Sequence, residues 1–303
     1  MISIIGSGRV GSAIAFLAAA TSLDDIHLVN RHKDKALGQA LDISNTIPED
    51  SPISVVGTDF SEIKNSEVIV ISASAGTYLK SRTDMLSKQV TMIRDIAKEI
   101  KKFAPDSKIL VVSNPVDILN YIFQKETGFP RECVIGVSSS LDSSRFRYLL
   151  AKEFQTKQSE IKNAMVLGEH DDSMVPIFSI AKLNSKPVLE LLNNSQVDKI
   201  TRELRDYWKV LRKFKGPSIF GIAKNTVDVI KSIIKNEVLS IPASVMLDGE
   251  YGLSDVCLGV PIRIGKDGMM NIQEIDLQKS ELESLKQSAD VIRKYLYQQQ
   301  TAS

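Results

Sequence analysis

The chain has 303 residues, 43% of them hydrophobic and 25% charged, so it is large enough to bury a core in one large domain or two medium ones. Its 38 basic and 37 acidic side chains nearly balance, which gives no electrostatic basis for binding nucleic acid or an anionic membrane surface. No apolar run reaches the roughly 18–20 residues of a membrane span, and the first predicted strand starts at Met1 or Ile2, which leaves no room for a signal peptide. We therefore expect a cytoplasmic protein without nucleic-acid or membrane partners.

The cysteines, Cys133 and Cys257, match no metal-ligand spacing and no disulfide framework. We expect both to be buried as small apolar side chains in a reducing compartment. The sequence predicts no metal site.

The first half of the chain alternates short β-branched runs with helical patterns. Strands are predicted at 2–5, 26–29, 53–56, 68–72, 109–112 and 133–137, and helices at 11–20, 35–43, about 82–103 and after Pro115. Continuous apolar strands joined by helices indicate a parallel sheet covered on both faces. Right-handed crossovers make this a doubly wound α/β sheet of the Rossmann type.

The second half has a mixed pattern. Helices are predicted at about 140–154, 196–214, 219–235 and 279–298, strands at 164–167, 175–180, 238–247 and 255–264, and a turn at 265–268. We therefore expect a dinucleotide-binding domain over residues 1–138, followed by an α+β substrate-binding and catalytic domain over residues 139–303. The glutamine-rich tail at 298–300 is expected to fray.

A glycine-rich loop follows the first strand and opens the first helix. Gly6 permits a tight turn, Gly8 lets the backbone approach a pyrophosphate, and Gly11 allows close packing of helix on strand. The motif is weak alone but strong in this strand–turn–helix context; the alternative is a purely structural turn. The predicted cofactor-binding residues here are Gly6, Ser7, Gly8, Arg9, Val10 and Gly11.

The second strand ends without a carboxylate. An NAD site has an acidic residue there to bind the ribose 2′-hydroxyl, whereas this chain has Asn30, followed by Arg31 and Lys33. Arg31 could bind a 2′-phosphate in a bidentate manner. We therefore predict that Asn30 and Arg31 contact the cofactor and that NADP is favoured, with NAD possible. The alternative is that Arg31 and Lys33 are simply solvated charges at a helix start.

The chain holds only three histidines, and one of them, His170, stands among Glu169, Asp171 and Asp172. Imidazole exchanges protons near neutral pH, and neighbouring carboxylates stabilise its charged form. These features favour a general acid/base; the alternative is a surface histidine in a polar turn.

Separate motifs together carry a resemblance to a known family. In order and spacing, residues 6–11, 114–117, 141–145, 168–173 and 259–261 resemble the lactate/malate dehydrogenase family, most closely its archaeal, lactate-dehydrogenase-like malate dehydrogenases. The resemblance implies an oxidoreductase of the tricarboxylic acid cycle that interconverts malate and oxaloacetate with NAD(P). It also implies a homo-oligomer, a tetramer or a dimer.

Residue roles follow from this resemblance. His170 resembles the catalytic acid/base, and Asp142 resembles the carboxylate that orients it. Arg145, on the same helix face as Asp142, resembles the arginine that binds the substrate carboxylate. Taken without the resemblance, Asp142 and Arg145 could be a helix cap and a surface pair.

The resemblance also assigns residues outside the two central motifs. Arg82 resembles the loop arginine that polarises the substrate carbonyl as the loop closes. Asn114 resembles a contact to cofactor and substrate, and Ser218 a hydroxyl of the substrate pocket. The alternatives are a solvated first-turn charge for Arg82 and an N-cap for Ser218.

Two departures from the family pattern bear on specificity. The loop at residues 75–82 is about one residue short and lacks the second arginine by which malate dehydrogenases bind the distal carboxylate; we hypothesise that Lys80 replaces it. Asp171 stands where the family has glycine. If its carboxylate faces the ring, it raises the working pKa of His170; the alternative is that it points to solvent.

Two other functions therefore remain open. The shortened loop keeps a lactate or other 2-hydroxy acid dehydrogenase as an alternative. A non-catalytic NAD(P)-binding sensor on the same fold is an alternative from a different class.

Overall fold

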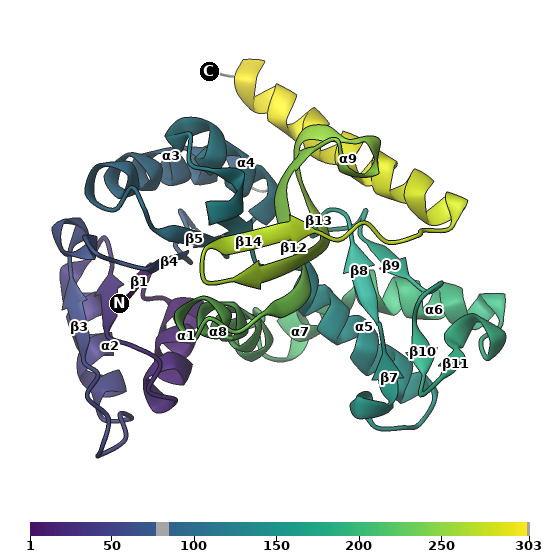
Figure 1. Ribbon diagram of the computed structural model, residues 1–303, viewed down its shortest axis with the longest axis horizontal. Helices are drawn as coiled ribbons and strands as arrows, with labels where there is room; N and C mark the ends of the chain where they lie inside the picture. Colours follow the sequence, from purple (N-terminus) through teal and green to yellow (C-terminus); the bar gives the residue numbers. More distant parts are fainter. Residues whose placement is uncertain (77–84, 302–303) are drawn as a thin grey trace. The chain divides into compact units, whose positions relative to one another are not determined.

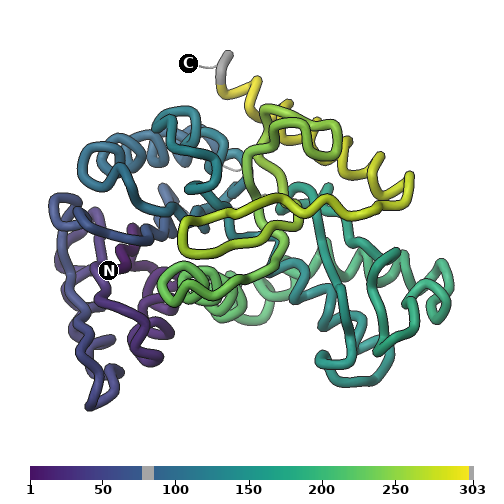
Figure 2. The backbone as a smooth tube through the Cα atoms, viewed as in Figure 1, coloured from purple at the N-terminus to yellow at the C-terminus, as the bar shows by residue number. Residues whose placement is uncertain are grey.

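The computed structural model describes residues 1–76 and 85–301. The chain divides into two compact units, and the first of them gathers residues 1–137, 219–240 and 263–271. The second unit holds residues 138–218, 241–262 and 272–303. Each unit therefore draws on separate stretches of the chain, which can be followed by colour in Figure 2.

Short parallel strands form the sheet of the first unit. They span Ile2–Ile5 (β1), Ile26–Val29 (β2), Val55–Thr58 (β3), Val68–Ile71 (β4), Lys108–Val111 (β5) and Val134–Gly136 (β6). Their order is β6–β5–β4–β1–β2–β3, and the neighbours pair in parallel. The order changes direction between β1 and β4, which is where doubly wound sheets bind nucleotides. The predicted Rossmann-type sheet is confirmed.

Helices cover both faces of these strands. They span Arg9–Ala20 (α1), Lys33–Ser44 (α2), Leu86–Phe103 (α3), Val116–Thr127 (α4) and Phe220–Ile234 (α8). Figure 1 shows α3 and α4 on one side of the strands and α1 and α8 on the other. Because both faces are covered, every residue of β1 and β4 is buried, which explains their unbroken apolar sequences.

Three further strands follow later in the chain: β12 (Leu239–Asp248), β13 (Ser254–Gly265) and β14 (Gly268–Ile272). The predicted turn at 265–268 joins β13 to β14, and Gly268 has a φ of +98°, which suits glycine. The sequence analysis did not predict β14, because its five residues, Gly-Met-Met-Asn-Ile, do not alternate regularly between apolar and polar side chains.

The second unit combines helices with short antiparallel strands. Its main elements are α5 (Ser139–Glu153), β7 (Ile161–Lys162), β8 (Met165–Leu167), β9 (Val175–Ile177), β10 (Lys182–Leu183), β11 (Lys186–Pro187), α6 (Asn194–Arg205), α7 (Tyr207–Phe214) and α9 (Lys279–Thr301). Short 3-10 turns lie at Phe60–Ile63, Arg131–Cys133, Gln158–Glu160, Val188–Glu190 and Glu250–Gly252 across the chain. Strands β8 and β9 pair antiparallel, and α5 packs on β8 while α9 packs on β9.

Two helix predictions need correction. The single helix expected over 196–214 is in fact two helices, because Asp206 interrupts the helical backbone between α6 and α7. Asn193 and Gln196 form a reciprocal capping box that starts α6 two residues earlier than predicted. Helix α9 ends at Thr301, three residues beyond the predicted end at 298.

Apolar side chains of α5 centre the core of the second unit. Phe146 is fully buried, and its ring meets that of Phe178 edge to face, with the ring centroids 4.8 Å apart. Leu149 and Leu150 of α5 and Leu204 of α6 belong to the same cluster. This core holds α5 in place, and the first turn of α5 carries Asp142.

No helix in the described part of the chain is both long and apolar enough to cross a membrane.

Truncating Phe146 should destabilise the protein strongly. Phe146→Ala removes a fully buried ring and leaves a cavity, so the free energy of unfolding in urea should fall by about 3–5 kcal/mol. Phe214→Ala is the matched control, because that side chain is 78% exposed, and it should change the free energy by less than about 0.5 kcal/mol. Equal effects of the two substitutions would contradict this assignment of the core.

Candidate active site

The carboxylate of Asp142 contacts two functional side chains at once. One oxygen accepts a hydrogen bond from Arg145 Nη1 at 2.9 Å, and the other lies against His170 Nδ1. The side chains are buried: Asp142 is 1% exposed, Arg145 6% and His170 8%. These exposures exclude the surface histidine and the surface ion pair that the sequence left open. The structure therefore brings the predicted centre together.

Helix α5 places Asp142 and Arg145 on one face, because residues three apart are neighbours on a helix. Ser143, between them, donates to the carbonyl of Ser139 and accepts from the backbone N–H of Val166 at 2.9 Å, which ties α5 to β8. The position of Asp142 in the first turn, near the positive end of the helix, favours its charged form.

Tyr207 covers Arg145 from α7. The guanidinium carbon lies 5.2 Å from the centroid of the Tyr207 ring, within reach of a cation–π interaction. Tyr207 in turn meets Tyr148 edge to face. Sequence reasoning missed Tyr207, since a tyrosine at a helix start has no distinguishing local pattern.

A pair of glycines brings the His170 segment close to the start of α5. The backbones of Gly168 and Gly259 exchange hydrogen bonds of 2.9 and 3.1 Å. A Cβ at Gly259 would collide with Ser139 Oγ and lie 2.7 Å from the Gly168 carbonyl, so only glycine permits this approach. Because Ser139 begins α5, the close packing sets His170 beside Asp142.

Asp171, the departure from the family pattern, is half-buried. Among the described residues, Gly168 has a positive φ but Asp171 does not. The aspartate therefore does not carry the backbone strain of a left-handed conformation. Together with Asp172 it helps to raise the pKa of Lys209 on α7, although the hydrogen bond from Lys209 to Asp206 is the larger cause. The Asp171 carboxylate is therefore one of several negative charges that act on Lys209.

The predicted nucleotide loop joins β1 to α1. Gly6 has a φ of +106°, and a Cβ there would lie 2.6 Å from the Ala73 nitrogen. A Cβ at Gly11 would collide with the Gly6 carbonyl, whereas one at Gly8 would meet no protein atom within 4 Å. Gly8 is also the N-cap of α1, and no side chain caps that end. An open space beside uncapped helix amides fits a pyrophosphate.

Strand β2 is followed by a polar, uncharged residue, Asn30. Asn30 Nδ2 donates to the buried Ser7 Oγ at 2.9 Å, and Asn30 Oδ1 accepts from the backbone N–H of His32. Arg31 is exposed and has no ion-pair partner within the described residues. Lys33 Nζ lies 3.8 Å from the Asp59 carboxylate, which offsets its charge in part. Arg9 and Val10 begin α1, and Arg9 is exposed.

Asn114 and Ser218 lie at the ends of elements. Asn114 follows β5, its peptide bond to Pro115 is cis, and its carboxamide oxygen is buried with no hydrogen-bond partner in the described part of the chain. Such an oxygen has an acceptor position that no described residue uses. Ser218 is half-buried, and Ile219 rather than Ser218 is the N-cap of α8, so the capping alternative for Ser218 is wrong. Arg82 and Lys80 lie outside the described residues.

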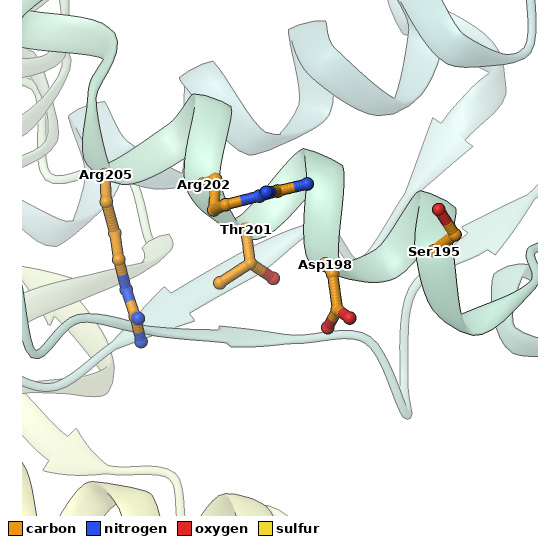
Figure 3. Close-up of a pocket in the computed structure, with 5 residues that line it drawn as sticks. All are labelled: Ser195, Asp198, Thr201, Arg202 and Arg205. Carbon is orange, nitrogen blue, oxygen red and sulfur yellow. The ribbon is translucent and has the colours of Figure 1, made fainter.

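A separate hollow of about 490 Å³ lies along α6. Figure 3 shows Asp198 and Arg205, which line it, pointing to the same side of the helix. Its other lining residues are Ser195, Thr201 and Arg202, so it holds none of the predicted site residues. Within the described residues, no group of three or more His, Cys, Asp and Glu side chains is placed to hold a metal ion.

Known protein families match nearly the whole chain. Residues 1–136 match the sequence profile of the lactate/malate dehydrogenase NAD-binding domain, and residues 139–302 match that of the lactate/malate dehydrogenase alpha/beta C-terminal domain. A malate dehydrogenase of Archaeoglobus fulgidus is 36% identical over 97% of this chain and 98% of its own length. L-lactate dehydrogenase 1 of Listeria innocua is 32% identical over 97% of this chain and 96% of its own length.

Solved structures agree with this match. The lactate dehydrogenase of Cryptosporidium parvum, solved with lactic acid and nicotinamide adenine dinucleotide, superposes with a TM-score of 0.95 at 30% identity. The match covers 100% of this chain and 98% of that one. The glycine loop and the His170–Asp142 pair agree with these matches. The chain belongs to the lactate/malate dehydrogenase family, whose members are oxidoreductases that act on a CH–OH group with a nicotinamide cofactor.

Proposed function

We propose that this protein is a malate dehydrogenase that interconverts (S)-malate and oxaloacetate with NAD(P), as an enzyme of the tricarboxylic acid cycle. The observation that carries the proposal is the Asp142 carboxylate, which contacts the general acid/base candidate His170 and the carboxylate-binding candidate Arg145 together. A 2-hydroxy acid carries both groups that such a pair would recognise, a hydroxyl and an adjacent carboxylate.

The roles of the residues follow from their contacts. His170 Nδ1 faces Asp142, so Nε2 is the nitrogen that takes the substrate hydroxyl proton. Asp142 favours the imidazolium that this transfer creates. Arg145, held by Asp142 and Tyr207, binds the C1 carboxylate. A nicotinamide cofactor held by the glycine loop would supply the hydride acceptor for C2 of the substrate. In the reverse direction His170 returns the proton to the substrate oxygen.

The remaining site residues are assigned by the same proposal. Arg82 polarises the substrate carbonyl, Ser218 lines the substrate pocket, and Asn114 contacts cofactor and substrate. The glycine loop, with Ser7, Arg9 and Val10, binds the pyrophosphate. In sequence, residues 1–138 then make up the dinucleotide-binding domain and residues 139–303 the substrate domain, while residues 219–240 and 263–271 of the latter range fold with the first compact unit. The buried carboxamide oxygen of Asn114 and the open space at Gly8 support these assignments.

We further propose a cytoplasmic homo-oligomer, a tetramer or a dimer. In the first unit, Phe16 of α1 is 45% exposed and Leu41 of α2 is 73% exposed, which leaves apolar surface for a second copy. The mass of the purified protein by light scattering tests this, and a mass equal to one chain would refute it.

Malate is favoured over lactate because the archaeal malate dehydrogenase is the more similar of the two relatives compared, at 36% against 32% identity. The second candidate, a lactate or other 2-hydroxy acid dehydrogenase, is supported by the lactate dehydrogenase relatives and by the missing second arginine in the loop at 75–82. A non-catalytic sensor is disfavoured, since it needs no buried histidine–carboxylate pair.

Oxaloacetate should be the best substrate when oxidation of the reduced cofactor is followed with oxaloacetate, pyruvate and other 2-oxo acids. Lys80→Ala should then raise the KM for oxaloacetate by about tenfold, because one charge-assisted contact to the distal carboxylate is lost. It should leave the kinetics with pyruvate unchanged, because pyruvate has no distal carboxylate. Lys35→Ala, which removes an exposed charge from α2, is the matched control. A preference for pyruvate would select the second candidate, and no turnover with any 2-oxo acid would select the sensor.

The cofactor preference should be for NADP, because the tip of β2 is neutral and Arg31 has no ion-pair partner among the described residues. Asn30→Asp should lower kcat/KM for NADPH by about tenfold or more, since a carboxylate repels the 2′-phosphate and suits the 2′-hydroxyl of NADH. Arg31→Ala should weaken NADPH use alone. A wild-type protein that prefers NADH would refute the proposed preference without touching the proposed reaction.

A further inference from the structure

Ser288 of the C-terminal helix α9 contacts both flanks of His170. The backbone N–H of Glu169 donates to Ser288 Oγ at 2.7 Å, and Ser173 Oγ lies 3.0 Å from the same oxygen. Ser288 is fully buried. His170 therefore lies in a short segment whose two ends contact one distant hydroxyl.

The directions of these hydrogen bonds can be deduced. Ser173 donates its hydroxyl hydrogen to the Glu169 carboxylate, which when ionised can only accept. A hydroxyl has a single hydrogen, so the hydrogen between Ser173 and Ser288 belongs to Ser288. The donors then form a closed ring from the Glu169 N–H to Ser288, from Ser288 to Ser173, and from Ser173 back to the Glu169 carboxylate. Ser288 is the one member of this ring outside the segment 169–173.

Ser288 interrupts an otherwise apolar stripe. Leu285, Ala289 and Ile292 of α9 are all fully buried beside it, at the spacing of one helix face. Burying a hydroxyl in such a stripe costs free energy unless its hydrogen bonds are made, so the alignment of the ring is energetically required.

Packing reinforces the hydrogen bonds. Gly168 has a φ of +87°, and a Cβ there would lie 2.7 Å from Ser288 Oγ. On its other side Gly168 pairs with Gly259, which packs on Ser139 at the start of α5. The segment that carries His170 is therefore held between α9 and β13, close to the helix of Asp142.

We propose that Ser288 is a positioning residue, whose hydroxyl holds the 169–173 segment so that His170 Nδ1 meets Asp142. This inference rests on the proposed role of His170 in proton transfer. The hydroxyl touches neither substrate nor cofactor and acts only through the segment. A displacement of about 1 Å at a reacting group can lower a rate by up to about 100-fold.

Ser288→Ala and Ser173→Ala each open the ring, so each should lower kcat for the best 2-oxo acid by about tenfold and change KM by less than about twofold. The double variant should be no slower than either single one, because one opened ring cannot be opened again. Ser173→Ala also keeps the test valid if Ser288→Ala fails to fold, since Ser173 is only half-buried.

Ser232→Ala is the matched control. Ser232 is 3% exposed, and its hydroxyl donates to the Glu237 carbonyl at 2.6 Å, away from the His170 segment. It should lower the melting temperature without changing kcat. Additive losses in the double variant, or an equal loss of kcat in Ser232→Ala, would overturn the proposal.

A second readout separates this proposal from the proposed function. The chain has only three histidines, so the ring resonances of His170 can be assigned by NMR with substitutions of His27 and His32. Ser288→Ala should shift or broaden the His170 ring resonance across a pH titration, and Ser232→Ala should not. An unchanged His170 resonance in Ser288→Ala overturns the proposal whatever the rate does. If the wild type turns over no 2-oxo acid while the resonance shifts, the proposed function fails and the positioning by Ser288 stands.

Discussion

The arrangement of the site depends on one buried carboxylate. Asp142 is almost without exposure and is shared by Arg145 and His170. A carboxylate removed from water is costly unless hydrogen bonds and opposite charge compensate it. The guanidinium of Arg145 and the start of α5 supply that compensation, and the histidine ring completes it. The same contacts orient His170 and Arg145, so the electrostatic requirement of Asp142 fixes the two side chains on which the proposed substrate site rests.

Small residues make this arrangement possible. Gly168 and Gly259 pair so closely that a side chain at either would collide with Ser288 or Ser139. Their contact joins the His170 segment to β13 and to the first residue of α5. The segment 259–261, which resembles the family pattern late in the sequence, therefore has a packing role next to the site. The residues that hold the site are spread over more than 100 positions of the chain, as the separation of 119 between Glu169 and Ser288 illustrates.

Local patterns were sufficient for much of the fold and for the centre of the site. Apolar strands such as β1 and β4 were predicted because both faces of a parallel sheet are buried. His170, Asp142 and Arg145 were predicted from motifs, and the structure adds that they touch. Tyr207 and Ser288 were not predicted, because their roles come from contacts across the fold and no local pattern marks them. The break at Asp206 was missed because the apolar periodicity continues across it.

The most direct test of this account is the rate of reduced-cofactor oxidation by the variant Asp142→Asn with the best 2-oxo acid. Asparagine keeps the shape of the side chain but removes the charge that favours a protonated His170. We expect kcat/KM to fall by about 100-fold to 10,000-fold, the range that general acid–base catalysis supplies, while the reduced cofactor still binds. A folded Asp142→Asn variant with kcat/KM within about twofold of the wild type would contradict the central role of this carboxylate.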